Sequence, residues 1–548
     1  MAVRLTVYDG AGVIGGNKIL LESGSSRLFF DFGTTYAVRE RYFEEYLRPR
    51  ANRGLLDLVT LDLLPPLLDL YRGDMQLGGL ARERLSRRPG ARELGPVDGV
   101  FLSHAHLDHS GYISFLREDV PVYCTGLSAA IAKAVQDTAP SDFEKEVCYQ
   151  APRQEKAGGV LESTRGASNR GRQYYTVDGP PSEPLARFWT QSPLKSKGLD
   201  CCPLLPAGER LGSLPGRAFP VDHSIYGAAA CAVETEAGWV VYTGDLRLHG
   251  RQGESSRRFA EAARELHPAL LVCEGTHVAA GRNTTEEEVH EHCLAAVRRA
   301  GQLVVADFGP RNVERLLIFR DIAARTGRRL AILARDAYLL DAMRYAEPAV
   351  SPRLYQSADA GTVSPRQYQW TDAGTMPDIA GDDALVVYRD LKSREGSWEA
   401  SLRERYSGKL VDAGEVSAHQ EDYIVCLSFW DMNELVDIDP RPGGLYVYSS
   451  SEAYSEEQRI DHRRLANWLG EFGLRLVGLR QGAGEPVDEE GFHASGHITG
   501  PDLLALIHTI SPRTVLPVHT QQPEFFVENL RGECRVIVPT RGEAVEVG

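Results

Sequence analysis

The most informative segment of the chain reads Ser103-His104-Ala105-His106-Leu107-Asp108-His109 and follows the apolar run VDGVFL at 97–102. We expect a strand to end and a helix to begin here, and such rigid junctions often carry binding sites. On an extended backbone alternate side chains point the same way, so His104 and His106 can bind one metal ion. Asp108 and His109, at the start of the helix, can then face a second ion. The segment therefore predicts a site for two metal ions.

The remaining ligands of two metal shells must come from distant segments, because one loop cannot supply them all. Three segments place a His or an Asp at the end of an expected strand or in a glycine-bounded turn: Val221-Asp222-His223-Ser224, Tyr242-Thr243-Gly244-Asp245 and Leu516-Pro517-Val518-His519. Nitrogen and oxygen ligands suit zinc or manganese, whereas calcium binds more oxygen atoms. We therefore expect two divalent ions, with zinc as the first choice and manganese as the alternative.

Taken in order, Asp31, the H-x-H-x-D-H motif at 104–109, His223 and Asp245 resemble the four successive motifs of the metallo-β-lactamase superfamily. The resemblance implies the αββα sandwich of that superfamily. It also implies the roles of the metal ligands. One metal would be held by His104, His106 and His223, and the other by Asp108, His109 and His519, with Asp245 bridging the two. Asp31 would orient a ligand histidine through the other nitrogen of its ring.

Later segments are similar to motifs A, B and C of the β-CASP branch, the nucleic-acid nucleases of the superfamily. These segments are Cys273-Glu274-Gly275-Thr276-His277, His493-Ala494-Ser495-Gly496-His497 and Leu516–His519, and the last two are most similar to ribonuclease J. The similarity implies that Glu274 and His497 form a pair in which His497 acts as general acid. Together with Asp108 they are the expected catalytic residues. The Ser495 hydroxyl and the Gly496 N–H would hold a phosphate oxygen.

The expected fold class is α/β, a metallo-β-lactamase sandwich with an inserted β-CASP α/β domain. We expect the sandwich to occupy 1–252 and 485–548 and the insertion to occupy 253–484. Strand and helix patterns alternate from about 257 to 346, which is typical of a parallel sheet with crossover helices. A Leu- and Arg-rich span at 36–92 is expected to be helical. The span 150–199, rich in Gly, Ser, Arg and Pro, is expected to be a surface loop or insertion.

The formal net charge of −15 argues against affinity of the whole surface for nucleic acid. A positive cleft confined to the seam between the domains is still expected. Phe308-Gly309-Pro310-Arg311-Asn312 opens an expected helix, where Arg311 either contacts substrate phosphate or belongs to an ordinary helix cap. No apolar run is long enough to span a membrane, and the N-terminus lacks the apolar region of a signal peptide. We therefore expect a cytoplasmic protein without a membrane partner.

These observations predict a two-metal phosphodiesterase that hydrolyses single-stranded RNA. Resemblance to ribonuclease J implies 5′-to-3′ exonuclease activity, with endonuclease activity as a further mode, and His519 favours RNA because the DNA-repair members carry Val there. The alternatives are a DNA nuclease of the same branch and a small-molecule hydrolase of the same fold. A non-catalytic RNA-binding subunit is disfavoured because every ligand position is filled. The stretch G-x-G-x-x-G at 10–15 is interpreted as a turn, since no helix fits after it.

Overall fold

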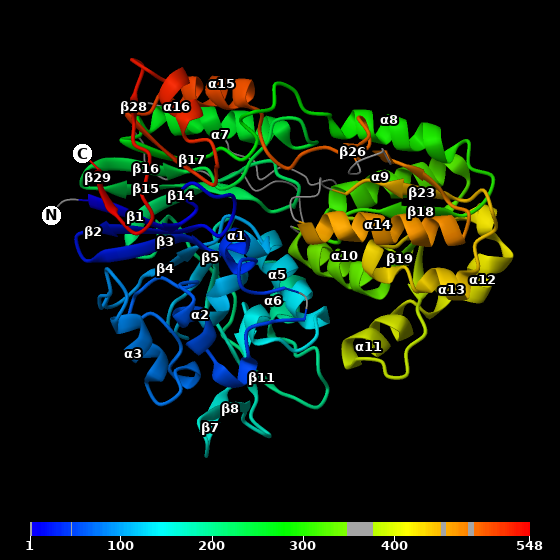
Figure 1. Ribbon diagram of the computed structural model, residues 1–548, viewed down its shortest axis with the longest axis horizontal. Helices are drawn as coiled ribbons and strands as arrows, with labels where there is room; N and C mark the ends of the chain where they lie inside the picture. The colour runs from blue at the N-terminus through cyan, green and yellow to red at the C-terminus, as the bar shows by residue number, and fades with distance from the viewer. Residues whose placement is uncertain (1–2, 45, 348–375, 451–455, 481–486, 548) are drawn as a thin grey trace.

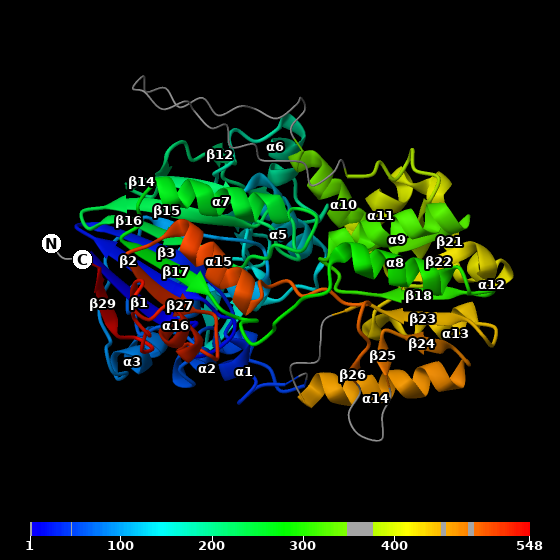
Figure 2. The ribbon, with the colours of Figure 1, turned by 90° about the horizontal axis from the view of Figure 1, so that it is seen from above.

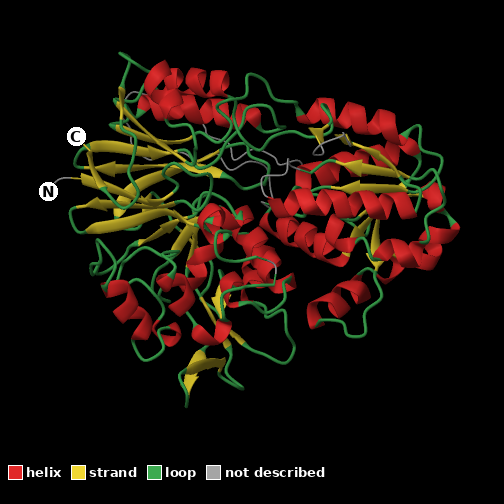
Figure 3. Cartoon of the chain, viewed as in Figure 1, coloured by secondary structure: helices red, strands yellow, loops and turns green. Residues whose placement is uncertain are grey.

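The computed structural model describes residues 3–44, 46–347, 376–450, 456–480 and 487–547. They form two bodies that meet along a seam in the middle of Figure 1. The first body contains both ends of the chain and two facing sheets. The second contains one parallel sheet with helices on both faces, as Figure 3 shows. The predicted α/β class with an inserted domain is confirmed.

The first sheet begins as an antiparallel meander whose strands are apolar on both faces. Ile19 and Leu21 of its second strand face the other sheet, whereas Leu20 between them faces the covering helices. In spatial order the sheet comprises β12 (Leu205–Pro206), β10 (Tyr174–Thr176), β5 (Val122–Cys124), β4 (Gly99–Phe101), β3 (Ser26–Phe32), β2 (Lys18–Ser23), β1 (Val3–Asp9) and β29 (Ala544–Val547). Its covering helices are α2 (Leu56–Thr60), α3 (Leu80–Ser86) and α5 (Gly126–Thr138).

The second sheet packs face to face on the first, and the apolar layer between them includes the stacked rings of Phe30 and Tyr242. In spatial order it comprises β13 (Arg210–Leu211), β14 (Leu214–Pro220), β15 (Ala229–Thr235), β16 (Gly238–Tyr242), β17 (Leu270–Glu274), β27 (Thr514–Val518) and β28 (Arg535–Val536). Helices α7 (Gly253–Glu265) and α15 (Gly500–Ile510) cover its outer face, as Figure 2 shows from above. The short helix α16 (Glu524–Asn529) follows β27. The first body is thus an αββα sandwich.

The second body is a doubly covered sheet in which every strand pair is parallel. In spatial order it comprises β21 (Leu410–Asp412), β20 (Leu385–Arg389), β19 (Arg329–Leu333), β22 (Tyr423–Cys426), β18 (Val304–Asp307), β23 (Leu445–Tyr448) and β24 (Arg475–Val477). One face packs on α8 (Glu286–Val297), α9 (Val313–Thr326) and α10 (Ala334–Ala346), and the other on α12 (Ala413–Ala418), α13 (Glu434–Ile438) and α14 (Glu456–Glu471). Helix α11 (Ser397–Arg405) and the hairpin of β25 (Leu479–Arg480) and β26 (Val487–Asp488) complete it.

The strand pairing shifts one expected domain boundary. β17 lies inside the span 253–484 but is hydrogen-bonded to β16 and β27 of the sandwich. The chain therefore stays with the first body beyond Glu274 and does not leave it at residue 252. The reason is that α7, the first helix of the alternating strand and helix pattern, packs on the sandwich and not on the inserted sheet.

The helical expectation for 36–92 is wrong, and of the two alternatives for 150–199 the simple surface loop is wrong. The span 36–92 holds only α1 (Tyr36–Arg39), α2 and α3 with 3₁₀ turns between them, because Pro65, Pro66 and repeated glycines interrupt a longer helix. The span 150–199 is largely ordered instead of forming a simple surface loop. It contains α6 (Glu183–Thr190) and the short strands β7 (Arg153–Lys156), β8 (Val160–Ser163), β9 (Asn169–Gly171) and β11 (Leu199–Asp200), with β6 (Tyr149–Gln150) paired to β9.

The two bodies are joined along one side of the seam by α5 and α10. The Tyr338 hydroxyl of α10 donates a 2.9 Å hydrogen bond to Asp137 of α5, which also pairs with the buried Lys133 at 2.6 Å. The rings of Phe188 and Tyr345 pack beside this contact. Within the described ranges, no helix is long and apolar enough to cross a membrane.

Candidate metal centre

The motif segment lies between a strand and a helix, as predicted. β4 ends at Phe101, and α4 (Leu107–Ser110) begins after His106, whose backbone is extended. Gly33 lies directly against this turn: a Cβ there would be 1.7 Å from the Asp108 carbonyl oxygen. The Gly16 N–H donates to the same oxygen at 2.9 Å, so the loop at 10–17 supports the motif and is not followed by a helix. These contacts hold the metal-binding side chains in place.

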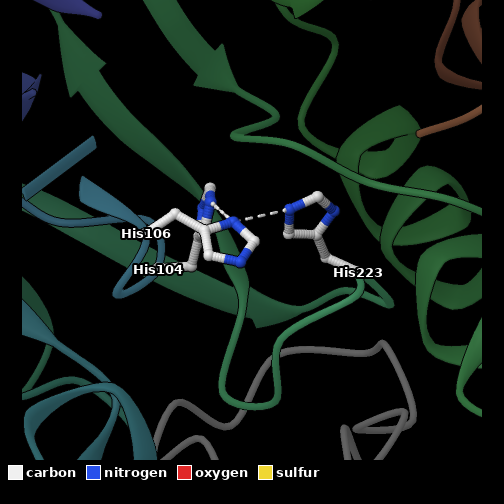
Figure 4. A group of neighbouring side chains, drawn as sticks. All are labelled: His104, His106 and His223. Carbon is white, nitrogen blue, oxygen red and sulfur yellow. Dashed lines mark hydrogen bonds between the residues drawn. The ribbon is translucent and has the colours of Figure 1, made fainter. Parts of the chain in front are cut away.

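Three histidines from two segments form the first cluster (Figure 4). His106 Nδ1 lies 3.1 Å from His104 Nε2 and 3.2 Å from His223 Nε2. Burial lowers the pKa of His106 to about 4 and holds the pKa values of His104 and His223 well below their usual range. Neutral imidazoles are the form that binds a metal, and here three of their nitrogens converge.

The second cluster consists of Asp108, His109, Asp245 and His519, which come from three distant parts of the chain. His109 Nε2 lies 3.0 Å from Asp245 Oδ2 and 3.7 Å from Asp108 Oδ2. His519 Nε2 lies 3.4 Å from Asp108 Oδ2 and 3.6 Å from Asp245 Oδ2. The structure therefore brings all seven predicted metal ligands into two adjoining groups.

Asp245 joins the two clusters. Its Oδ2 lies 3.9 Å from both His104 Nε2 and His223 Nε2, in addition to its contacts in the second cluster. Its Oδ1 is buried, and no described residue donates a hydrogen bond to it. Although burial opposes ionisation, His109 and His519 hold the pKa of Asp245 well below its usual range. A buried, ionised carboxylate with a free oxygen beside the neutral imidazoles of His104 and His223 is a donor set that fits divalent metal ions.

Asp31 holds one ligand ring, as the resemblance implied. It is fully buried at the end of β3 with a φ of 57°, an unusual backbone conformation for a residue other than glycine. His109 Nδ1 lies 2.7 Å from Asp31 Oδ2, which leaves Nε2 of that ring to face the second cluster. Asp31 also accepts hydrogen bonds from the Ser103 N–H, the Ser103 hydroxyl and the Tyr242 hydroxyl, at 2.6–2.7 Å.

Two further groups that orient ligands were missed in the sequence. The Gly496 carbonyl accepts a 2.6 Å hydrogen bond from His223 Nδ1, and Thr276 Oγ1 lies 2.7 Å from His519 Nδ1. A Cβ on Gly496 would be 3.0 Å from the His223 ring, so glycine permits this close approach. Both residues lie inside the two motif segments that contain Glu274 and His497. What the motifs could not indicate is which ring each residue contacts.

Glu274 and His497 lie beside the second cluster. Glu274 Oε2 is 3.0 Å from His497 Nδ1, and Glu274 Oε1 accepts a 2.7 Å hydrogen bond from the Leu246 N–H. His497 Nδ1 also lies 3.9 Å from Asp245 Oδ2. Although burial opposes it, Glu274 raises the pKa of His497 to about 9. The His497 side chain remains 18% exposed, whereas that of Glu274 is buried.

A cavity of about 580 Å³ lies at the seam and is lined by residues of both bodies. Arg311 lines it and interacts electrostatically with Asp108 and Tyr36. Its guanidinium forms no ion pair or hydrogen bond with any residue that the structure describes. The aromatic residues of the lining are Phe308, Phe429, Trp430 and Tyr448. The expected positive cleft is instead mixed in charge: Lys145, Arg311 and Arg335 share the lining with Asp307, Asp336 and Asp461.

Asp307, at the end of β18, is expected to make the stability of the protein depend on pH. Tyr446 donates a 2.6 Å hydrogen bond to it, and burial raises its pKa to about 7 from 3.8. The folded state therefore holds a proton that the unfolded chain releases at lower pH, so stability falls as pH rises from about 4 to 7. Relative to Asp307→Asn, the free energy of unfolding of the native protein should fall by about 3 kcal/mol between pH 5 and pH 8.

Guanidinium unfolding of both proteins at pH 5 and pH 8 measures this difference. Asp383→Asn, at a fully exposed position of the same body, is the matched control and should track the native protein. Equal pH slopes for Asp307→Asn and the native protein would refute the assignment of the buried proton to Asp307.

Comparison with known proteins agrees with this architecture. Residues 66–159 match the profile of the beta-lactamase superfamily domain. The chain is 24% identical over 529 residues to ribonuclease J of Mycolicibacterium smegmatis, covering 94% of this chain and 68% of the relative. It is 23% identical over 528 residues to ribonuclease J of Corynebacterium glutamicum, covering 94% of this chain and 53% of the relative. The chain thus spans about two thirds of the first relative and about half of the second.

A solved structure extends the comparison of the fold. A protein of unknown function from Enterococcus faecalis V583 matches all of this chain and all of its own, with a TM-score of 0.63 and 21% sequence identity. That likeness concerns the fold alone. Together, the matches confirm the resemblance to the metallo-β-lactamase superfamily and to its ribonuclease J-like β-CASP members. They also agree with the expected enzyme class, a hydrolase that uses divalent metal ions.

Proposed function

We propose that this chain, a ribonuclease J-like member of the metallo-β-lactamase superfamily, is a two-metal phosphodiesterase that hydrolyses single-stranded RNA. The observation that carries the proposal is the union of the two ligand clusters at Asp245, with the Glu274–His497 pair beside them. The cluster alone would suit many hydrolases. The added pair favours a polymeric phosphodiester, and so does the seam cavity with Arg311, which forms no ion pair within the described part of the chain.

Zinc is the metal that we propose first, with manganese as the alternative, because histidine nitrogens and carboxylate oxygens suit both. His104, His106 and His223 would hold one ion, and Asp108, His109 and His519 the other, with Asp245 shared. When bound, two such ions would lower the pKa of water and stabilise charge on a phosphoryl group. Three ligand rings keep their orientation through a partner: Asp31 for His109, Gly496 for His223 and Thr276 for His519.

His497 is the proposed general acid. Glu274, fixed by the Leu246 N–H, holds the Nδ1 side of the ring through a 3.0 Å contact. The ring can then present its other nitrogen to the leaving oxygen of the phosphodiester and donate a proton there. Ser495 and the Gly496 N–H are proposed to hold a phosphate oxygen. Asp108 completes the catalytic set, since it contacts His519 and faces Arg311.

The seam cavity is the proposed path of the RNA. Aromatic side chains such as Phe308 and Trp430 can stack on unpaired bases, a sequence-tolerant mode of binding single strands. Arg311 would contact the backbone phosphate. Of the two alternatives for this residue, we therefore propose the phosphate contact and not an ordinary helix cap. We propose 5′-to-3′ exonucleolytic cleavage, with endonucleolytic cleavage as a second mode, in the cytoplasm.

Two measurements test the proposal. Metal analysis of the purified protein should return about two equivalents of divalent ion per chain. Incubation with 5′-labelled single-stranded RNA, the matching DNA and a model ester such as 4-nitrophenyl acetate should show cleavage of RNA first. Faster hydrolysis of DNA would establish the DNA nuclease instead, and hydrolysis of the ester alone would establish a small-molecule hydrolase.

Arg311 should act on binding more than on the chemical step. Arg311→Met removes one charge-assisted contact to phosphate, typically about 1.5–3 kcal/mol, so KM for RNA should rise at least about tenfold. The slope of log KM against log salt should fall by about 0.7 for a single strand. Steady-state kinetics at two or more salt concentrations measure both.

The control for this prediction is Arg325→Met, which changes a half-exposed arginine of α9 that is paired with Asp321. It should leave KM unchanged. An unchanged KM for Arg311→Met would remove Arg311 from the substrate path.

A further inference from the structure

Five charged side chains are buried together behind two of the metal-binding segments. Asp222, Arg247, Glu286, Glu314 and Arg315 have side chains that are at most 1% exposed, and we call them the ion network. Asp222 precedes the ligand His223, and Arg247 follows the shared ligand Asp245 by two positions. The other three belong to the first turns of α8 and α9. The ion network therefore crosses the seam between the two bodies.

One guanidinium makes most of these connections. Arg247 Nε lies 3.3 Å from Asp222 Oδ1, Nη1 lies 3.0 Å from Glu286 Oε1, and Nη2 pairs with Glu314. Nη1 also donates a 3.2 Å hydrogen bond to the carbonyl of Ser495. Arg247 thus contacts the segment of His223, both helix starts and the segment that carries His497.

Arg315 extends the ion network on the side of the second body. Its Nη2 lies 2.8 Å from Glu286 Oε2, and its Nη1 donates to the carbonyls of Ser449 at 2.8 Å and Phe492 at 3.2 Å. It lies in the first turn of α9, four positions after Arg311, which precedes this helix. The ion network therefore connects the metal clusters at one end with the proposed phosphate contact at the other.

Stability alone does not account for this arrangement. Burying a charge costs several kcal/mol, and apolar side chains of similar volume often stabilise a fold as well or better. Guanidinium–carboxylate contacts do impose a defined geometry, because the planar fork accepts few orientations. The space is also closed: a Cβ on Gly250 would be 2.4 Å from Arg247 Nε and from Asp222 Oδ2. A buried network of this kind is suited to fixing the register of two bodies.

We propose that Arg247 is a positioning residue that sets the distance and angle between the metal clusters and the Arg311 side of the RNA path. This inference rests on the proposed function and adds how the inserted domain is aligned with the metal site. RNA must contact both bodies at once, whereas a small phosphodiester needs only the clusters. Arg247 should therefore matter for RNA and little for the small substrate.

The experiment compares Arg247→Lys and Glu314→Gln with the native protein. The first keeps the charge but loses the fork, and the second keeps the shape of Glu314 but loses its charge. The control is Arg320→Lys, an arginine of the same helix whose ion pair with Asp382 at 2.7 Å stays within the second body. For each protein we would measure metal content, cleavage of single-stranded RNA, hydrolysis of bis(4-nitrophenyl) phosphate, and hydrogen exchange by mass spectrometry.

The expected result is a selective loss. A misplacement of about 1 Å can cost about a hundredfold in rate, so kcat/KM for RNA should fall about a hundredfold in Arg247→Lys. Hydrolysis of bis(4-nitrophenyl) phosphate should stay within about threefold, a margin that corresponds to less than 1 kcal/mol, with two equivalents of metal retained. The amides at 495–498 and in the first turns of α8 and α9 should exchange at least about tenfold faster. Glu314→Gln should also lower kcat/KM for RNA and speed up exchange of these amides. Arg320→Lys should change neither RNA cleavage nor hydrogen exchange.

Two outcomes would overturn the inference. A parallel fall of both activities together with loss of metal would make Arg247 a support of the metal site only. Unchanged RNA cleavage and unchanged exchange, with or without a lower melting temperature, would make it merely structural. If the native protein cleaved no RNA, the proposed function would be wrong. Hydrogen exchange would then be the measurement that tests whether Arg247 aligns the two bodies.

Discussion

Replacement of Asp245 by asparagine is expected to slow RNA hydrolysis by at least about a thousandfold, which corresponds to about 4 kcal/mol of transition-state stabilisation. The reason is that Asp245 Oδ2 lies near both clusters, 3.0 Å from His109 Nε2 and 3.9 Å from His104 Nε2. An amide of the same size has no charge to offset two divalent ions. The metal content should fall from about two equivalents to one or fewer.

Three measurements check this expectation: metal analysis, RNA cleavage, and the melting temperature with and without added zinc. Ions that bind only the folded state stabilise it, by about 2.7 kcal/mol at a hundredfold excess over the dissociation constant. The native protein should therefore gain more from zinc than Asp245→Asn does. Asp119→Asn, at an exposed position paired with Arg117, is the control. Full metal content and full activity in Asp245→Asn would contradict the shared-ligand assignment.

His497→Ala is expected to lower kcat for RNA by a factor of about 10²–10⁴, the usual range for loss of a general acid. Two equivalents of metal should remain, because all seven metal ligands are intact. Glu274→Gln should have a smaller effect in the same direction, since the amide can still accept the Leu246 N–H but holds the His497 ring less firmly. Single-turnover cleavage of RNA separates this chemical step from binding.

A substrate with a good leaving group makes this prediction specific. Release of 4-nitrophenolate needs no proton, so hydrolysis of a 4-nitrophenyl phosphodiester should be far less affected by His497→Ala than RNA cleavage is. His508→Ala changes a half-exposed histidine of α15 that pairs with Glu533, and it should leave both activities unchanged. If His497→Ala slowed both substrates equally, His497 would position the phosphate and not donate the proton.

Local sequence was sufficient for part of the metal site. His104, His106, Asp108 and His109 are neighbours in the chain, and their directions follow from the strand and helix that carry them. The alternation of strands and helices in the inserted domain also followed from local patterns, since α8 and α9 begin within a few residues of the expected positions. Resemblance to known motifs then indicated His223, Asp245 and His519, which local spacing could offer only as candidates.

Other features depended on contacts between distant segments. The boundary after Glu274 follows from hydrogen bonds of β17 to a strand more than 200 residues later. The mixed charge of the seam cavity arises because acidic and basic residues from four segments meet there. Neither of these could be read from composition or periodicity.

By itself, the sequence determined the chemistry that the chain can offer: a set of imidazoles and carboxylates at strand ends, and apolar patterns that dictate where strands and helices form. Only the tertiary structure decided how this chemistry is assembled. It placed Asp245 between the two clusters and brought Gly496 and Thr276 into contact with particular ligand rings. It also buried Arg247 in contact with three carboxylates. The physical reason is that backbone preferences and burial patterns act over a few residues. Ligand geometry and ion pairing instead depend on distances of about 3 Å between residues up to several hundred positions apart.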